Sequence, residues 1–164
     1  MDEKIDDAEL LYPSVDLAYD FVKSSYDWML TRFEAANSKI QGLLTFSATV
    51  TAAFPILAKA IFDDVDFSSL WFYGAIIAFI FLVVTGIVGR RMGSIVLVHP
   101  EVLYEKYLYY SHWRFQQTII YWAGKHFNSN TKIIVKKAWC TGIMTIFLLG
   151  EIVCIAVWIA VQVN

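Results

Sequence analysis

Residues 67–89 contain no charged residue and no proline, and the run stops at Arg90 and Arg91. With a rise of about 1.5 Å per residue, a helix of this length crosses the roughly 30 Å of bilayer hydrocarbon. A soluble helix of the same length would need a polar face, and this run has none. The run therefore predicts a transmembrane helix, and the chain is expected to be a membrane protein.

The composition agrees with a membrane protein. The chain has 164 residues, of which 58% are hydrophobic and 17% are charged, and its net charge is -2. This charge balance gives no reason to expect nucleic acid as a partner. The acidic N-terminal tail, residues 1–13, lacks the basic-then-apolar order of a cleaved signal peptide. We expect one membrane domain over residues 1–164, inserted by its own membrane helices.

A long first helix is predicted over residues 14–62. Apolar or small residues recur along it at alternating spacings of four and three, which is the pattern of a packed helix seam. The seam consists of Val15, Tyr19, Val22, Tyr26, Met29, Phe33, Ala36, Ile40, Leu43, Ser47, Val50 and Phe54. Residues 14–40 are expected in the cytoplasm and residues 41–62 in the membrane, with a kink at Pro55.

Small residues mark two candidate packing faces in the membrane. The first span carries a stripe formed by Ser38, Gly42, Thr45, Thr49 and Ala52. The second span and its extension, residues 67–98, carry Thr85, Gly89 and Gly93 at four-residue spacing. Such residues let two helix backbones approach closely. The glycines could equally be tolerated without a contact.

Residues 100–127 are predicted to form a cytoplasmic or interfacial helix that is rich in aromatic residues. Its seam against the first helix would use Leu103, Tyr107, Tyr110, Gln117 and Tyr121. Alternatively, the segment lies along the lipid headgroups. The sequence Asn128-Ser129-Asn130 predicts a turn, after which Thr131 would cap a third span over residues 131–162. The expected fold is all-α, with three transmembrane helices and a cytoplasmic helical extension.

The basic residues predict the topology. Of the 13 Lys and Arg residues, only Lys59 falls outside residues 1–40 and 90–137, and the connection at 63–66 carries three acidic residues. By the positive-inside rule, a multi-pass protein of the inner membrane is expected, with a cytoplasmic N-terminus and an external C-terminus.

Glu151 is the one ionisable residue deep inside a predicted span. A charged carboxylate there costs several kcal/mol, so it must be paired, protonated or in contact with water. At its depth the other spans offer Thr51 and Tyr73, and Lys59 lies within reach further out. Two interpretations stay open: Glu151 controls an ion or solute pathway, or it holds helices together.

The sequence gives no sign of an enzyme. His99, His112 and His126 lack the spacing of metal ligands. Serine and threonine are plentiful, but no arrangement of nucleophile and base and no phosphate-binding glycine loop is recognisable. We expect no catalytic residue, no metal and no cofactor.

The stretch Arg32–Thr49 takes a cytoplasmic helix through Asn37-Ser38-Lys39 straight into a span rich in Leu, Ser and Thr. It resembles the entry to the first span in small bacterial anti-phage membrane effectors of the Pycsar and CBASS type, where a polar Asp/Asn-x-Lys-Ala/Ile element precedes the span. The resemblance covers about 20 of the 164 residues. Many such effectors have two or four spans, whereas three are predicted here, without a separate nucleotide-sensing domain. The resemblance implies an oligomer that perturbs the inner membrane when triggered.

Together these features predict a homo-oligomer in the lipid bilayer that forms, gates or perturbs a membrane pathway, with Glu151 influencing that pathway. A different class of function is an accessory or scaffold subunit that docks a cytoplasmic protein and transports nothing itself. A third hypothesis, a subunit of a proton-coupled transporter, rests on Glu151 alone and has no inverted repeat behind it.

Overall fold

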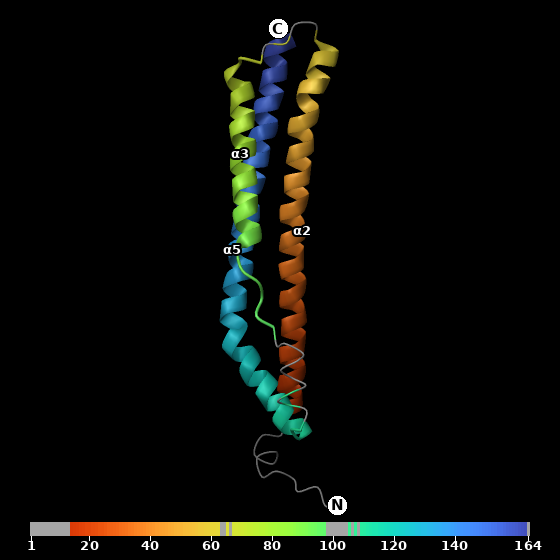
Figure 1. The fold of residues 1–164 in the computed structure, drawn as a ribbon, viewed down its shortest axis with the longest axis vertical. Coiled ribbons are helices and arrows are strands. Elements are labelled where there is room, and N and C mark those ends of the chain that lie inside the picture. Colours follow the sequence, from red (N-terminus) through yellow and green to blue (C-terminus); the bar gives the residue numbers. More distant parts are fainter. Residues whose placement is uncertain are drawn as a thin grey trace, which may run out of the picture. The chain divides into compact units, whose positions relative to one another are not determined.

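The structure is a computed structural model that describes residues 14–62, 65, 67–97, 105, 107 and 109–163. The described residues form three helices and no strand: α2 (Val15–Ile61), α3 (Leu70–Arg91) and α5 (His112–Val163) (Figure 1). All three are long and apolar enough to cross a membrane. The predicted acidic tail, residues 1–13, lies outside the described residues.

Two compact units share the chain. The first, called the two-helix unit, holds the described residues of Met1–Phe33 and Ser94–Ile133. The second, called the three-helix unit, holds those of Glu34–Gly93 and Ile134–Asn164. The helices α2 and α5 contribute to both units, and α3 belongs to the three-helix unit alone.

The seam predicted along α2 is the face that packs. All twelve of its residues are buried or half-buried, and Met29, Ala36, Ile40 and Ser47 are the most enclosed. Within each unit α2 and α5 run in parallel, since contacting residues advance together along both helices. In the two-helix unit the bonded pairs are Asp16 with Gln116 and then Tyr26 with Ala123, and in the three-helix unit they are Asn37 with Lys137 and then Ser47 with Glu151. In the latter, α3 runs antiparallel to both (Figure 1). Helix α2 continues through Pro55 to Ile61.

The predictions of a separate helix at 100–127 and of a break at 128–130 were wrong. One helix, α5, runs from His112 to Val163, and residues 98–104, 106 and 108 lie outside the described residues. Asn130 closes no turn because its buried side-chain amide bonds to both the N–H and the C=O of Val96. Thr131 is no cap, since its hydroxyl donates to the Phe127 carbonyl inside the helix.

The aromatic segment of α5 packs against α2, one of the two arrangements left open by the sequence, but through another face. Tyr110, Gln117 and Tyr121 are exposed, Tyr107 is half-buried, and Leu103 lies outside the described residues. The buried residues are Trp113, Gln116, Ala123 and Asn130. The rings of Tyr109 and Tyr121 are therefore largely exposed on the surface.

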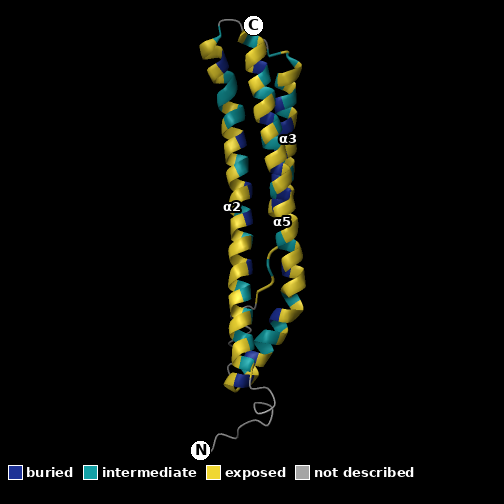
Figure 2. Cartoon of the chain, turned by 180° about the vertical axis from the view of Figure 1, so that it is seen from behind, coloured by how far each residue is buried: buried dark blue, intermediate teal, exposed yellow. Residues whose placement is uncertain are grey.

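Exposed positions run along every helix of the three-helix unit (Figure 2), and large hydrophobic residues occupy many of them. Exposed large hydrophobic residues follow one another along α3 and the second half of α5, among them Ile77, Ile80, Val84, Val88, Ile146, Leu149 and Val153. A soluble protein seldom exposes so large an apolar surface. The inside is formed by Ile40, Leu82 and Met144, with Leu43, Leu44, Phe147 and Leu148 packed around them.

The close approach of helices in this core gives a first prediction. A Cβ atom at Gly89 would lie 3.1 Å from Ile40 Cδ1 and 3.2 Å from Cys140 Cβ, whereas one at Gly142 would meet nothing within 4 Å. Gly89→Ala should lower the free energy of unfolding by about 1–3 kcal/mol through overpacking, although alanine favours helix. Gly142→Ala should be neutral or slightly stabilising. Thermal unfolding of both variants in detergent checks this, and equal stability of Gly89→Ala and wild type would contradict the packing.

Candidate functional site: a buried carboxyl between two helices

Glu151 lies in the interior of the three-helix unit, where only 1% of its surface is exposed. Its two carboxyl oxygens accept hydrogen bonds from two hydroxyls of α2. Ser47 Oγ donates to Oε2 over 2.5 Å, and Thr51 Oγ1 donates to Oε1 over 2.6 Å. The carboxyl group therefore links α5 to α2 through both of its oxygens.

The two donors lie on one face of α2 because residues four apart in a helix stack one turn above the other. Ser47 belongs to the packed seam and is fully buried. Thr51 differs from three other membrane threonines in what its hydroxyl does. Those of Thr49, Thr85 and Thr145 each donate to the carbonyl four residues earlier in their own helix. The hydroxyl of Thr51 instead donates to the carboxyl group of Glu151 on the neighbouring helix.

Apolar layers enclose the site on both sides along α5. Met144 lies seven residues before Glu151 and belongs to the core that it forms with Ile40 and Leu82. Trp158 lies seven residues after Glu151 and is fully buried. The Trp158 ring packs on Phe54 with centroids 5.0 Å apart and stacks on Phe67 at 5.9 Å. Polar interactions between such layers are strong, and an unpaired polar group there is costly.

Of the three partners expected for Glu151, Thr51 reaches it and two do not. Lys59 is exposed, and its Nζ lies 5.9 Å from the centre of the Phe67 ring. Tyr73 is 53% exposed, with its ring against Phe72. Ser47 was expected to pack but not to bond with Glu151. Its place on the seam, one turn before Thr51, was the sequence signal for this second donor.

Lys137 is a second buried ionisable group. From the sequence it was expected only to mark the inner face of the membrane. It is 1% exposed, and its Nζ donates to Asn37 Oδ1 of α2 at 2.9 Å and to the Gly89 carbonyl of α3 at 3.0 Å. Gly89 lies in the last turn of α3, where carbonyls have no partner within the helix. The ammonium group therefore joins all three helices and caps the end of α3.

A repeat of seven residues along α5 would have revealed both groups. Every seventh position is buried, namely Gln116, Ala123 and Asn130 in the two-helix unit and Lys137, Met144, Glu151 and Trp158 in the three-helix unit. Polar residues at such positions must bond to a neighbouring helix. The same spacing was recognised on α2, where apolar residues occupy it, but not on α5.

The small residues predicted to pack helices differ in their surroundings. Gly89 is buried against α2 and α5. Gly42, Thr45 and Thr49 are exposed, and Thr85 bonds to the Phe81 carbonyl of its own helix. Gly93 follows the end of α3 with a positive φ of 55°, a conformation that suits glycine at a helix C-terminus. The stripe on α2 therefore faces away from the other helices of the chain.

The bonds of Glu151 lead to an asymmetric prediction about stability. If the acceptor is removed in Glu151→Leu, the hydroxyls of Ser47 and Thr51 can turn to the carbonyls four residues earlier. If the donors are removed in Ser47→Ala with Thr51→Val, a buried carboxyl group loses its partners. The double variant should therefore lose about 3–5 kcal/mol of unfolding free energy, and Glu151→Leu clearly less.

The free energy of unfolding in detergent is measured for both variants. The internal control is the triple variant, which combines Glu151→Leu with Ser47→Ala and Thr51→Val. Because it leaves neither a donor nor an acceptor unpaired, it should be more stable than the double variant. A Glu151→Leu protein at least as unstable as the double variant would contradict this account of the site.

Comparisons with known proteins give no match: no protein-family model, no curated protein and no solved structure is similar to this chain. Among the described residues, no cluster of three or more His, Cys, Asp or Glu side chains is arranged to hold a metal ion. What the site offers chemically is a buried carboxyl group that two hydroxyls hold, between apolar layers, in a helix bundle with an apolar surface.

Proposed function

We propose that the chain is an oligomeric protein of the inner membrane that forms, gates or perturbs a pathway across the bilayer, with Glu151 as the controlling residue. The observation that carries this proposal is the position of α2. One side of its membrane half holds Glu151 through Ser47 and Thr51, and the opposite side exposes the small residues Ser38, Gly42, Thr45, Thr49 and Ala52.

Three features support insertion into the membrane. The helices α2, α3 and α5 are long and apolar enough to span it, and the three-helix unit has an apolar exterior. Arg90 and Arg91 end α3, and Lys136 is exposed beside the start of the apolar part of α5. Basic residues on one side of the spans favour a cytoplasmic N-terminus and an external C-terminus.

Self-association is proposed for the exposed stripe on α2. Ser38, Gly42, Thr45, Thr49 and Ala52 are all exposed, and a Cβ atom built on Gly42 would meet no atom within 4 Å. Small residues at this spacing allow a second helix to approach closely in lipid. We assign the stripe to contacts with neighbouring copies around a shared rotation axis, because symmetric assemblies are the commonest oligomers.

The pathway is linked to this contact through α2 itself. In the structure the carboxyl group of Glu151 is enclosed and bonded, and the proposed function takes this arrangement as the closed state. A shift of α2 driven by neighbouring copies would separate its hydroxyls from Glu151 and leave the carboxyl group to water. The resemblance to anti-phage membrane effectors adds to the proposal that a trigger causes this shift during defence.

Replacement of the carboxyl group tests its role. Glu151→Gln keeps the size and two hydrogen-bonding atoms but removes the acid, so it should change ion or dye flux by about tenfold or more if the carboxyl group controls the pathway. Flux through proteoliposomes, with the exposed Glu34→Gln as matched control, measures this. If the Glu151→Gln variant has the same flux as wild type, the proposed role of Glu151 is wrong.

The stripe is tested by the mass of the complex in nanodiscs, measured by native mass spectrometry. Wild type should form one closed oligomer of at least three copies, and Gly42→Leu with Thr45→Leu should shift it to monomers. Gly142→Leu, on the open side of α5, is the control and should leave the mass unchanged. A monomeric wild-type protein would contradict self-assembly.

A monomer would instead favour the alternative function, a non-transporting accessory or scaffold subunit. One observation supports it: α2 exposes Leu17 and Phe21, both 74% exposed, and Trp28, 55% exposed, on one side of the two-helix unit. Large apolar side chains outside the predicted span are typical of protein-binding surfaces. In that case a cytoplasmic protein partner would dock on this row.

A further inference from the structure

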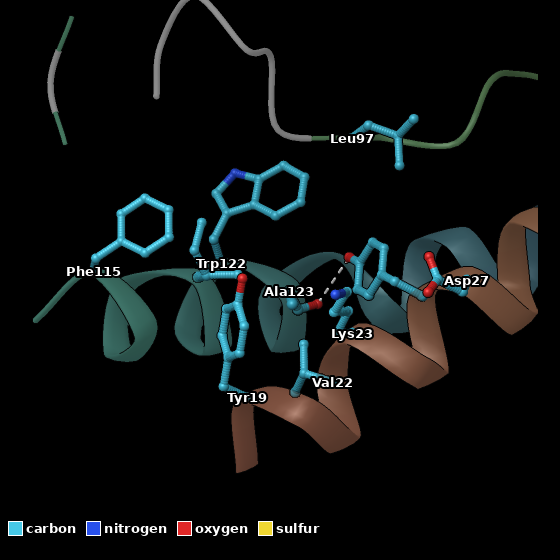
Figure 3. Close-up of a pocket in the computed structure, with 10 residues that line it drawn as sticks. Tyr19, Val22, Lys23, Asp27, Leu97, Phe115, Trp122 and Ala123 are labelled. Atoms are coloured by element: carbon cyan, nitrogen blue, oxygen red, sulfur yellow. Dashed lines mark hydrogen bonds between the residues drawn. The ribbon is translucent and has the colours of Figure 1, made fainter. Parts of the chain in front are cut away.

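The two-helix unit contains a cavity of about 420 Å³ between α2, α5 and the segment that follows α3 (Figure 3). Its volume lies in the range of small-molecule sites, about 300–1,000 Å³. Tyr19, Lys23 and Asp27 reach it from α2, Phe115 and Trp122 from α5, and Leu97 from the segment. Neither the site at Glu151 nor the exposed stripe uses any of these residues.

Specific hydrogen bonds keep the walls of the cavity in place. The Tyr26 hydroxyl donates to the Ala123 carbonyl at 3.2 Å and so ties α2 to α5 beside the cavity (Figure 3). Burial raises the pKa of the Tyr26 hydroxyl. The segment is held through Val96, whose N–H and C=O both bond to the Asn130 side chain.

The lining combines aromatic rings with two opposite charges. The rings of Tyr19, Phe115 and Trp122 offer stacking surfaces on both helices. Lys23 and Asp27 lie one helical turn apart on α2, and both are exposed at the edge of the cavity. In Figure 3 the ammonium group of Lys23 and the carboxylate of Asp27 occupy separate positions along that edge. A cation and an anion are therefore presented side by side next to aromatic walls.

We propose that this cavity binds a small aromatic zwitterion, a molecule with one aromatic ring system, an ammonium group and a carboxylate, of the chemical class of the aromatic amino acids. The ring system lies among Tyr19, Phe115 and Trp122. The carboxylate pairs with Lys23 and the ammonium group pairs with Asp27. An ammonium group also gains from the faces of neighbouring aromatic rings.

The paired charges select against simpler ligands. A purely cationic aromatic amine would satisfy Asp27 but meet the like charge of Lys23, and a purely anionic aromatic acid would meet Asp27. An uncharged ring would bind by apolar contact alone. The zwitterion is the class that complements both charges at once, and a cavity of this volume limits it to one ring system with short substituents.

Binding to the full-length protein in nanodiscs tests this proposal, with calorimetry and empty nanodiscs as blank. Four probes share one ring and differ in charge: tryptophan, tryptamine, indole-3-propionate and indole. Tryptophan should bind to one site, about tenfold or more tighter than each of the others. Lys23→Met and Asp27→Asn should each weaken it about tenfold. Lys125→Met and Asp20→Asn, matched exposed changes outside the cavity, should have no effect.

Equal binding of all four probes would overturn the zwitterion class, and the absence of saturable tryptophan binding would overturn the site. Loss of binding in the matched controls as strong as in Lys23→Met and Asp27→Asn would also refute it. All four substituted residues are exposed, so the variants should fold, and circular dichroism verifies this. The readout is neither flux nor oligomer mass, so it fails or succeeds independently of the proposed function.

Discussion

Polar side chains inside an apolar helix bundle must find partners, and the three-helix unit depends on how two of them do so. Glu151 bonds to Ser47 and Thr51, and Lys137 bonds to Asn37 and to the carbonyl of Gly89. Both groups project from the same face of α5, two heptads apart. Because an unpaired charge in such surroundings costs several kcal/mol, a slip of α5 against α2 by one residue would break both sets of bonds together. The polar contacts thus fix the register that apolar packing alone would leave loose.

The parts of the fold that could be predicted are those encoded by spacing along a single helix. The seam of α2 from Val15 to Phe54 was evident because apolar positions recur every three or four residues. The turn at residues 128–130 and the cap at Thr131 were predicted from local preferences that the fold overrides. Asn and Thr favour turns and caps because they bond to nearby backbone. Asn130 bonds instead to Val96, 34 residues away, and the sequence around Asn130 does not indicate so distant a partner.

The partners of Glu151 show the same limit. Counting residues from the membrane face gives depth, and depth correctly placed Thr51 near Glu151. It does not give the direction in which a side chain points, so Lys59 and Tyr73 were also expected as partners, although both are exposed. Direction was available from the α2 seam, which contains Ser47, and from the seven-residue repeat on α5, which contains Glu151. Used together, the two repeats would have paired these residues.

The exposed stripe of α2 and the face that contacts α5 differ in the hydrogen bonds that are lost when their neighbours change. On the exposed stripe the Thr49 hydroxyl is satisfied by the Thr45 carbonyl, so lipid can be exchanged for another helix without breaking a hydrogen bond. On the inner face, any movement of Ser47 and Thr51 away from α5 deprives a buried carboxyl group of its donors. In the proposed function, assembly therefore precedes opening, and opening requires new partners for Glu151. Water entering between α2 and α5 supplies such partners, and a hydrated carboxyl group is what a conducting pathway needs.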